Sequence, residues 1–123
     1  MERLTQPEEE AMQVLWKLEG GFIKEVLELL PAPQPPYTTL ASTIRNLERK
    51  GYLQSEKLGN TYRFTPLIAA EDYRKRFMST FVGDYFKNSY KELVSFFAQD
   101  QKISAAELQE IIDMIERQKP PQS

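Results

Sequence analysis

The most restrictive feature of this sequence is a change in the spacing of its apolar residues at Gly51. Before it, apolar side chains recur every three or four residues, which is the period of an amphipathic helix. After it, through residue 65, apolar and polar side chains alternate, which is the period of a half-buried strand. Beyond Pro66 the helical period returns. The pattern therefore predicts helices interrupted by one short β-hairpin.

Three amphipathic helices are expected before this change. The first covers residues 6–18, where Thr5 and Glu8 have the spacing of a capping box. The second covers residues 22–30 and is followed by four prolines within six residues, which resist helix formation and make a stiff connector. The third covers residues 37–50 and is closed by a glycine, the usual C-terminal cap.

The third helix has two contrasting faces. Leu40, Ile44 and Leu47 share one side and are expected in the core. Trp16 lies on the apolar stripe of the first helix, and because large aromatic side chains there are normally buried, we expect it to pack that helix on this one. Small hydroxyl side chains and arginines gather within about 60° on the opposite side: Thr38, Ser42, Arg45 and Arg49.

The hairpin completes a recognisable order of elements. Residues 52–57 and 61–65 read as two short strands, with a turn over 58–60 between them. Three helices followed by a hairpin predict a winged helix-turn-helix, a mainly α fold with a small β-hairpin wing. The side chains expected to seat the hairpin on the helices are Leu53, Tyr62 and Phe64. Those expected at the wing, facing a DNA backbone, are Lys57, Asn60 and Arg63.

The local distribution of charge favours a nucleic-acid partner more than the net charge of the whole chain does. The chain has a net charge of -2, but residues 37–66 hold five basic and two acidic groups, a local excess of +3. A basic stretch of this kind is the electrostatic footprint of a phosphate-binding face. Small residues let a helix approach base edges closely, and arginines reach phosphates or guanine. The predicted DNA-binding residues are Thr38, Thr39, Ser42, Arg45, Asn46, Arg49, Lys57, Asn60 and Arg63.

Composition argues against several other classes of protein. The chain has no cysteine and no histidine, which removes disulfides, thiolate metal sites and the commonest general base. A hydrolase built only on carboxylates is a distant alternative, but no deep-pocket signature supports it, so we expect no enzyme activity, no metal and no cofactor. No apolar run approaches the roughly 20 residues of a membrane span, and no signal-peptide pattern is present, so we expect a cytoplasmic protein without membrane insertion.

Residues 67–123 are expected to form a helical dimerisation domain, separate from a DNA-binding domain over residues 1–66. Helices are predicted over 69–82, 84–98 and 105–117, the last opened by Ser104 and Glu107 in capping-box spacing. Short helices with this much apolar surface require a partner, and a second copy with twofold symmetry is the simplest one. The predicted dimerisation residues are Tyr73, Phe77, Phe81, Tyr90, Leu93, Val94, Phe97, Leu108, Ile111, Ile112 and Ile115.

The assembled pattern resembles the penicillinase-repressor family of winged-helix repressors (BlaI/MecI/CopY type). The resemblance covers nearly the whole chain, and it rests on the order and spacing of several short motifs. They are EEAMQVLW over residues 9–16, YTTL over 37–40, Ile44, Leu47, KGYL over 50–53, GNTY over 59–62, Pro66, and Leu93-Val94 with the closing amphipathic helix.

The resemblance implies a homodimer on a pseudo-palindromic operator, with base reading by Thr38, Thr39 and Ser42. It also implies relief of repression by a membrane-embedded sensor protease that cuts the dimerisation domain, here between Phe96 and Phe97. This chain has Phe96 where the antibiotic-responsive members have asparagine. It also has Ala41 and Asn46 at positions that are basic in some members, and it lacks the cysteine metal site of the copper-responsive branch.

Two other functions fit the same pattern of elements. A winged-helix regulator could respond to a small ligand held among the aromatic side chains of the C-terminal helices. A winged helix can also serve as a protein-interaction module without binding DNA. The hydroxyl and arginine side chains on the exposed face of the third helix favour the DNA-binding hypothesis over the second of these.

Overall fold

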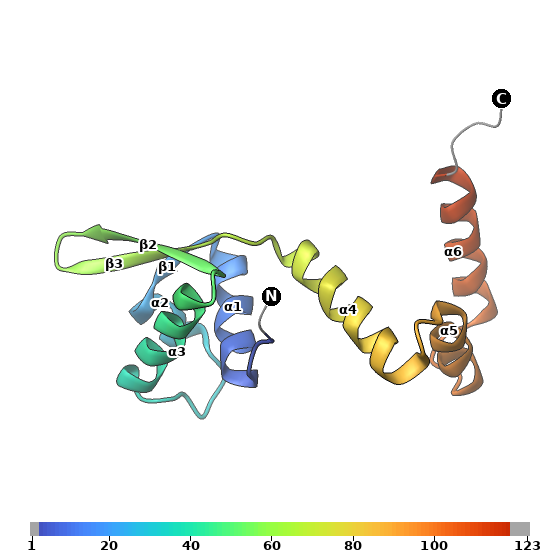
Figure 1. Cartoon of the computed structure of the whole chain (residues 1–123), viewed down its shortest axis with the longest axis horizontal. Helices are drawn as coiled ribbons and strands as arrows, with labels where there is room; N and C mark the ends of the chain where they lie inside the picture. The colour runs from blue at the N-terminus through green and yellow to red at the C-terminus, as the bar shows by residue number, and fades with distance from the viewer. Residues whose placement is uncertain (1–2, 119–123) are drawn as a thin grey trace. The chain divides into compact units, whose positions relative to one another are not determined.

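The computed structural model describes residues 3–118. Within that range it has six helices and a three-stranded antiparallel sheet (Figure 1), which confirms the predicted fold class. The elements are α1 (Gln6–Leu18), β1 (Gly21–Phe22), α2 (Ile23–Leu29), α3 (Tyr37–Arg49), β2 (Leu53–Leu58), β3 (Thr61–Pro66), α4 (Ala70–Phe86), α5 (Tyr90–Gln99) and α6 (Ala105–Gln118).

Contacts divide the chain into two compact units, residues 1–75 and residues 76–123. We call the described part of the first unit the head (residues 3–75) and that of the second the tail (residues 76–118). This division lies nine residues beyond the boundary predicted at Pro66, because the start of α4 packs on the head. The assignment of functions to the two units remains a prediction.

The helices of the head begin and end where local chemistry dictates. The capping box at α1 is confirmed: the Thr5 amide donates to Glu8 Oε1 at 2.8 Å, and the Glu8 amide donates to Thr5 Oγ1 at 3.3 Å. The helix ends at Leu18, and its C-cap Glu19 has the left-handed conformation. Gly20 follows with φ of 118°, a value that favours glycine. The predicted bounds of α1 and α3 agree with the structure to within one residue.

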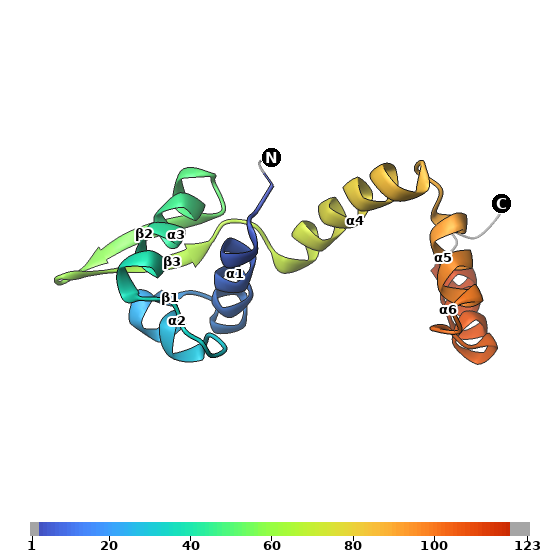
Figure 2. The same cartoon turned by 90° about the horizontal axis from the view of Figure 1, so that it is seen from below.

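The sheet contains a strand that sequence periodicity did not predict. β1 is two residues long and pairs with β3, so that the strand order is β1-β3-β2. Two residues are too few to show any alternation, and the prediction had placed Phe22 in the second helix. Leu58 of β2 pairs with Thr61 of β3, so the turn between the strands has two residues, 59 and 60. The predicted turn over 58–60 is one residue longer. The hairpin extends past the helices of the head in both views (Figures 1 and 2).

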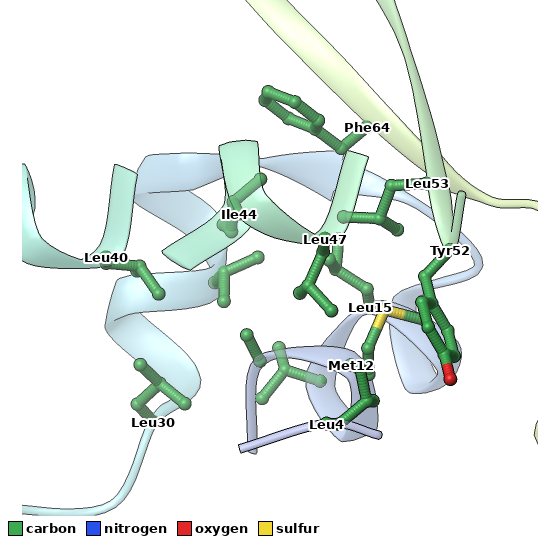
Figure 3. Packing of buried hydrophobic residues seen from close by; sticks show 13 residues of the cluster. Leu4, Met12, Leu15, Leu30, Leu40, Ile44, Leu47, Tyr52, Leu53 and Phe64 are labelled. Carbon is green, nitrogen blue, oxygen red and sulfur yellow. The ribbon is translucent and has the colours of Figure 1, made fainter. Parts of the chain in front are cut away.

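One apolar core holds the head together. Leu40, Ile44 and Leu47 of α3 are buried against Met12 and Leu15 of α1, as Figure 3 shows. Leu53 and Phe64 bring both strands of the hairpin onto the same core, and Tyr62 packs against it, as predicted. Burying side chains of this size stabilises a fold by about 1.5–3 kcal/mol each. The core therefore fixes α3 and the hairpin relative to each other.

The helices of the tail differ from the prediction in where they break. We predicted a break at Gly83, but α4 continues through it to Phe86, and the chain turns at Lys87 and Asn88, both with positive φ. A Cβ atom at Gly83 would lie 3.0 Å from Asn88 Oδ1, so this glycine permits a close approach instead of ending the helix. Ser89 then caps α5 by accepting from the Glu92 amide at 3.1 Å.

The last helix of the tail agrees with its prediction. The Ser104 amide donates to Glu107 Oε1 at 3.1 Å, and the Glu107 amide donates to Ser104 Oγ at 3.1 Å, which confirms the second capping box. α6 then extends from Ala105 to Gln118, one residue past the predicted end. The C-terminal end of the predicted dimerisation domain, residues 119–123, lies outside the described residues.

Candidate nucleic-acid interface

The exposed face of α3 carries all six side chains predicted for this helix. Leu40, Ile44 and Leu47 are buried underneath, so the amphipathic pattern determines which side faces outward. Pro36 precedes the helix and supplies no side-chain cap, which leaves the first backbone N–H groups available to an anion such as a phosphate. The exposed residues are Thr38, Thr39, Ser42, Arg45, Asn46 and Arg49.

Hydrogen bonds within α3 hold part of this face in place. Arg49 Nη2 donates to Asn46 Oδ1 at 3.1 Å, one turn earlier on the same helix. Thr43 Oγ1 donates to the Thr39 carbonyl at 3.1 Å. Both bonds join residues of α3 to each other and use no side-chain atom of Thr38, Thr39 or Ser42. These three side chains are therefore available to contact a ligand such as a DNA groove.

The wing contributes Lys57 and Asn60 to the same side of the head. Lys57 lies directly opposite Tyr62 across the hairpin, and directly paired residues project from the same face of a sheet. Tyr62 packs on the core beneath α3, so Lys57 lies on the face that α3 occupies. Asn60 is exposed in the turn beside Gly59, which has a positive φ of 64°. Both residues lie in the wing, and their contact with a DNA backbone stays a prediction.

The structure separates Arg63 from the other predicted residues. Its neighbours Tyr62 and Phe64 face α3, so the alternation of the strand directs Arg63 to the opposite face, in register with Glu56 and Phe22. Its guanidinium lies over Gly20 and donates to Thr65 Oγ1 at 3.2 Å. Arg63 therefore does not belong to the candidate interface. The alternation of side chains along a strand already predicts this position, because Arg63 lies between Tyr62 and Phe64.

Arg45 is exposed but engaged with the wing. Its guanidinium carbon lies 4.8 Å from the centre of the Tyr62 ring and 5.5 Å from that of Phe64, both within the range of a cation–π interaction. Its Nη1 also lies 3.5 Å from Glu48 Oε1. The prediction assigned Arg45 to phosphate contact, and the structure shows that it contacts aromatic side chains of the hairpin.

A buried ion pair, which sequence analysis did not predict, joins α1 to the end of α3. Lys50 Nζ lies 2.7 Å from Glu8 Oε1, and Glu8 is only 3% exposed. Burial by itself raises the pKa of Glu8, but hydrogen bonds from Lys50 and Thr5 outweigh it and hold this pKa below the usual value of 4.5. The two residues are 42 positions apart, so no local pattern links them.

The start of α4 is attached to the head by aromatic side chains. Trp16 Nε1 donates to the Ile68 carbonyl at 2.8 Å, and the Trp16 and Tyr73 rings are 5.4 Å apart. Tyr73 also donates from its hydroxyl to Glu9 Oε1 at 2.6 Å, and burial together with this bond raises its pKa. Trp16 packs against the core of the head, as predicted, and it also binds the segment after the wing. Tyr73, which was predicted to be a dimer residue, packs on Trp16 within the head.

The tail leaves most of its large apolar side chains exposed. Val82 and Leu93 are its buried hydrophobic residues among those the structure describes, so the predicted dimer residue Leu93 packs inside the tail itself. Predicted dimer residues that are exposed are Phe77, Tyr90, Val94, Phe97, Ile111, Ile112 and Ile115, while Phe81 and Leu108 are half-buried. Exposed apolar side chains that the prediction missed are Met78, Tyr85 and Met114, together with Phe96 of the predicted cleavage site.

Three helices, a hairpin wing and an outward-facing third helix with hydroxyl and arginine side chains define a winged helix-turn-helix transcription regulator. The chain belongs to the penicillinase repressor family, whose model matches residues 4–117. It is therefore a transcriptional repressor of the resistance-regulator type and not an enzyme.

The relatives support the same assignment over nearly the full length of the chain. A penicillinase repressor of Bacillus licheniformis is 25% identical over 118 residues, covering 95% of this chain and 92% of its own. The methicillin resistance regulatory protein MecI of Staphylococcus aureus is 18% identical over 115 residues, covering 93% and 94%. A penicillinase repressor of Staphylococcus aureus is 22% identical over 113 residues, covering 91% and 90%.

Among residues 3–118, no helix is long and apolar enough to cross a membrane.

Proposed function

We propose that this repressor binds a palindromic operator as a homodimer, with α3 of each head in the major groove and the wing on the adjacent phosphates. The observation that carries the proposal is the surface of α3. Hydroxyl side chains lie near the start of the helix and arginines follow, all on the side opposite to the buried stripe. This is the order expected of a recognition helix, whose first residues approach base edges.

Homodimerisation is proposed from the surface of the tail. Aromatic side chains of α4 and α5 and isoleucines of α6 are exposed, and a small monomer rarely exposes so many large apolar side chains. A second copy supplies an equally apolar surface and places two heads on one DNA molecule. Two linked heads bind far more tightly than one, because the second head binds at a high effective concentration.

Relief by proteolysis is proposed at the bond between Phe96 and Phe97 in the tail. This bond lies inside α5, where the Phe96 carbonyl accepts from the Asp100 amide at 3.1 Å and the Phe97 carbonyl accepts from the Lys102 amide at 2.9 Å. A membrane-bound sensor protease would therefore act after local opening of the end of α5. Cleavage there would remove α6 and leave the α3 surface intact.

The proposal is tested by binding to DNA fragments from the region upstream of the gene, titrated with salt. We expect tight binding to one short dyad that weakens steeply as salt rises, because phosphate contacts release counterions. Ser42→Asp should weaken this binding by about 100-fold, since it places a carboxylate against the DNA. Lys91→Gln, which removes one charge from the tail, is the matched control and should bind nearly as well as the wild type.

The role of the tail is tested with a chain that ends at Phe96. This chain should bind the dyad at least about 100-fold more weakly than the full chain, and sedimentation should show it as a monomer. Equal binding by the shortened chain would remove both the dimer and the proteolytic step from the proposal.

A further inference from the structure

Arg45 and Glu48 of α3 contact both strands of the wing on the side of the sheet that faces α3. The guanidinium of Arg45 lies over the Tyr62 and Phe64 rings of β3, at 4.8 Å and 5.5 Å. Glu48, one turn later, accepts a hydrogen bond from Ser55 Oγ of β2. An ion pair between Arg45 and Glu48 at 3.5 Å connects the two contacts.

These contacts lie next to the part of the wing that faces DNA in the proposed function. Tyr62 is in register with Lys57, and Ser55 is two residues before Lys57 on the same face of the strand. Beyond Phe64 and Leu53 the hairpin has no buried side chain to hold it on the head. The orientation of Lys57 therefore depends on the contacts that α3 makes with Tyr62 and Ser55.

We propose that Arg45 is a positioning residue that orients the wing for DNA, acting through Tyr62 instead of making a phosphate contact of its own. An arginine suits this role because its planar guanidinium stacks on aromatic rings, whereas a lysine ammonium is compact and strongly hydrated. This inference rests on the proposed function for its effect on DNA binding. Its effect on the wing of the free protein is independent of that function.

The first test measures amide hydrogen exchange in the full chain without DNA. Arg45→Gln should raise the exchange rates of the hairpin amides over residues 54–64 by about two- to fivefold, the loss expected for an exposed cation–π contact. Arg49→Gln is the matched control, because Arg49 lies on the same face and hydrogen-bonds Asn46 of its own helix. Unchanged exchange in Arg45→Gln, or an equal rise in Arg49→Gln, would overturn the inference.

The second test is a double-mutant cycle on operator binding. Lys57→Ala should weaken binding in the wild type by about five- to tenfold and lower the salt slope by about one per half-site. In the Arg45→Gln background, Lys57→Ala should change affinity less than about twofold and leave the slope unchanged, because the wing is already misplaced. In the Arg49→Gln background, Lys57→Ala should reduce the affinity and the salt slope as much as it does in the wild type.

Multiplicative losses for Arg45→Gln and Lys57→Ala would show that Arg45 contacts DNA independently, and would overturn the inference. Full rescue of affinity by Arg45→Lys would overturn it as well, because lysine keeps the charge and loses the planar stacking. If the wild type fails to bind any dyad while the exchange result holds, the proposed function fails and the positioning of the wing by Arg45 stands.

Discussion

The head and the tail use similar apolar side chains in different ways. In the head, Ile44 is completely buried within one core that joins α1, α3 and the hairpin. In the tail, Ile112 is 50% exposed, and Val82 is one of two buried hydrophobic residues among those described. A unit that buries its apolar stripe can fold by itself, whereas one that exposes the stripe needs a second surface. The head therefore has a core of its own, whereas the proposed role of the tail is to cover its apolar side chains with a second copy.

The largest expected effect is that of the same substitution made in the two units. Ile44→Ala should destabilise the head by about 2–5 kcal/mol, because it leaves a cavity in a packed core. Since this residue lies in a core made within one chain, the loss should not depend on protein concentration. Urea denaturation at several concentrations measures both quantities.

Ile112→Ala is the matched substitution in the tail. It should weaken self-association by about tenfold, and its effect on unfolding should shrink as the protein is diluted. Sedimentation and dilution of the two variants side by side provide the measurement. A concentration-independent loss for Ile112→Ala as large as that for Ile44→Ala would contradict the contrast between the units.

The next effect concerns where the head ends. A fragment of residues 1–75 should fold, whereas a fragment of residues 1–66 should be less stable by about 2–4 kcal/mol. The shorter fragment lacks the Ile68 carbonyl that Trp16 binds, and also the Tyr73 ring. Thermal unfolding of the two fragments checks this difference. Equal midpoints would show that the head ends at Pro66.

A third comparison uses the two capping boxes. Glu8→Gln should destabilise the head by about 1–3 kcal/mol, because Lys50 is left without its carboxylate in a buried site. Glu107→Gln should change stability very little, since this carboxylate is exposed and glutamine also fits a capping box. Equal losses in urea denaturation would show that the burial of Glu8 has no energetic consequence.

The smallest effect is a dependence of stability on pH. The pKa of Glu8 is lower in the folded head than its usual value of 4.5, so protonation favours the unfolded chain. The stability from this group is complete above that value and is lost as the pH falls through the folded pKa. Urea midpoints from about pH 7 to pH 3 should fall less steeply for Glu8→Gln than for the wild type. Parallel curves would rule out this contribution.

Most of the candidate interface was predictable from the sequence, because the face on which a residue lies depends on the period of its own helix or strand. The stripe of Leu40, Ile44 and Leu47 determines which side of α3 faces outward. Four polar residues on the opposite side follow from it: Thr38, Ser42, Arg45 and Arg49. The same reasoning, applied strictly to β3, would have placed Arg63 away from α3. Arg45 is different, because its contact with Tyr62 joins two elements that the sequence shows only as separate patterns.

The sequence by itself determined the order of helices and hairpin, the capping boxes at Thr5 and Ser104, and the exposed face of α3. These features follow from interactions over a few residues, such as the bond between Thr5 and Glu8. Only the tertiary structure decided the partner of Lys50, the position of Trp16 against Ile68, and the contact of Arg45 with the wing. These contacts join residues that are distant along the chain, and which distant residues meet depends on how the whole core packs.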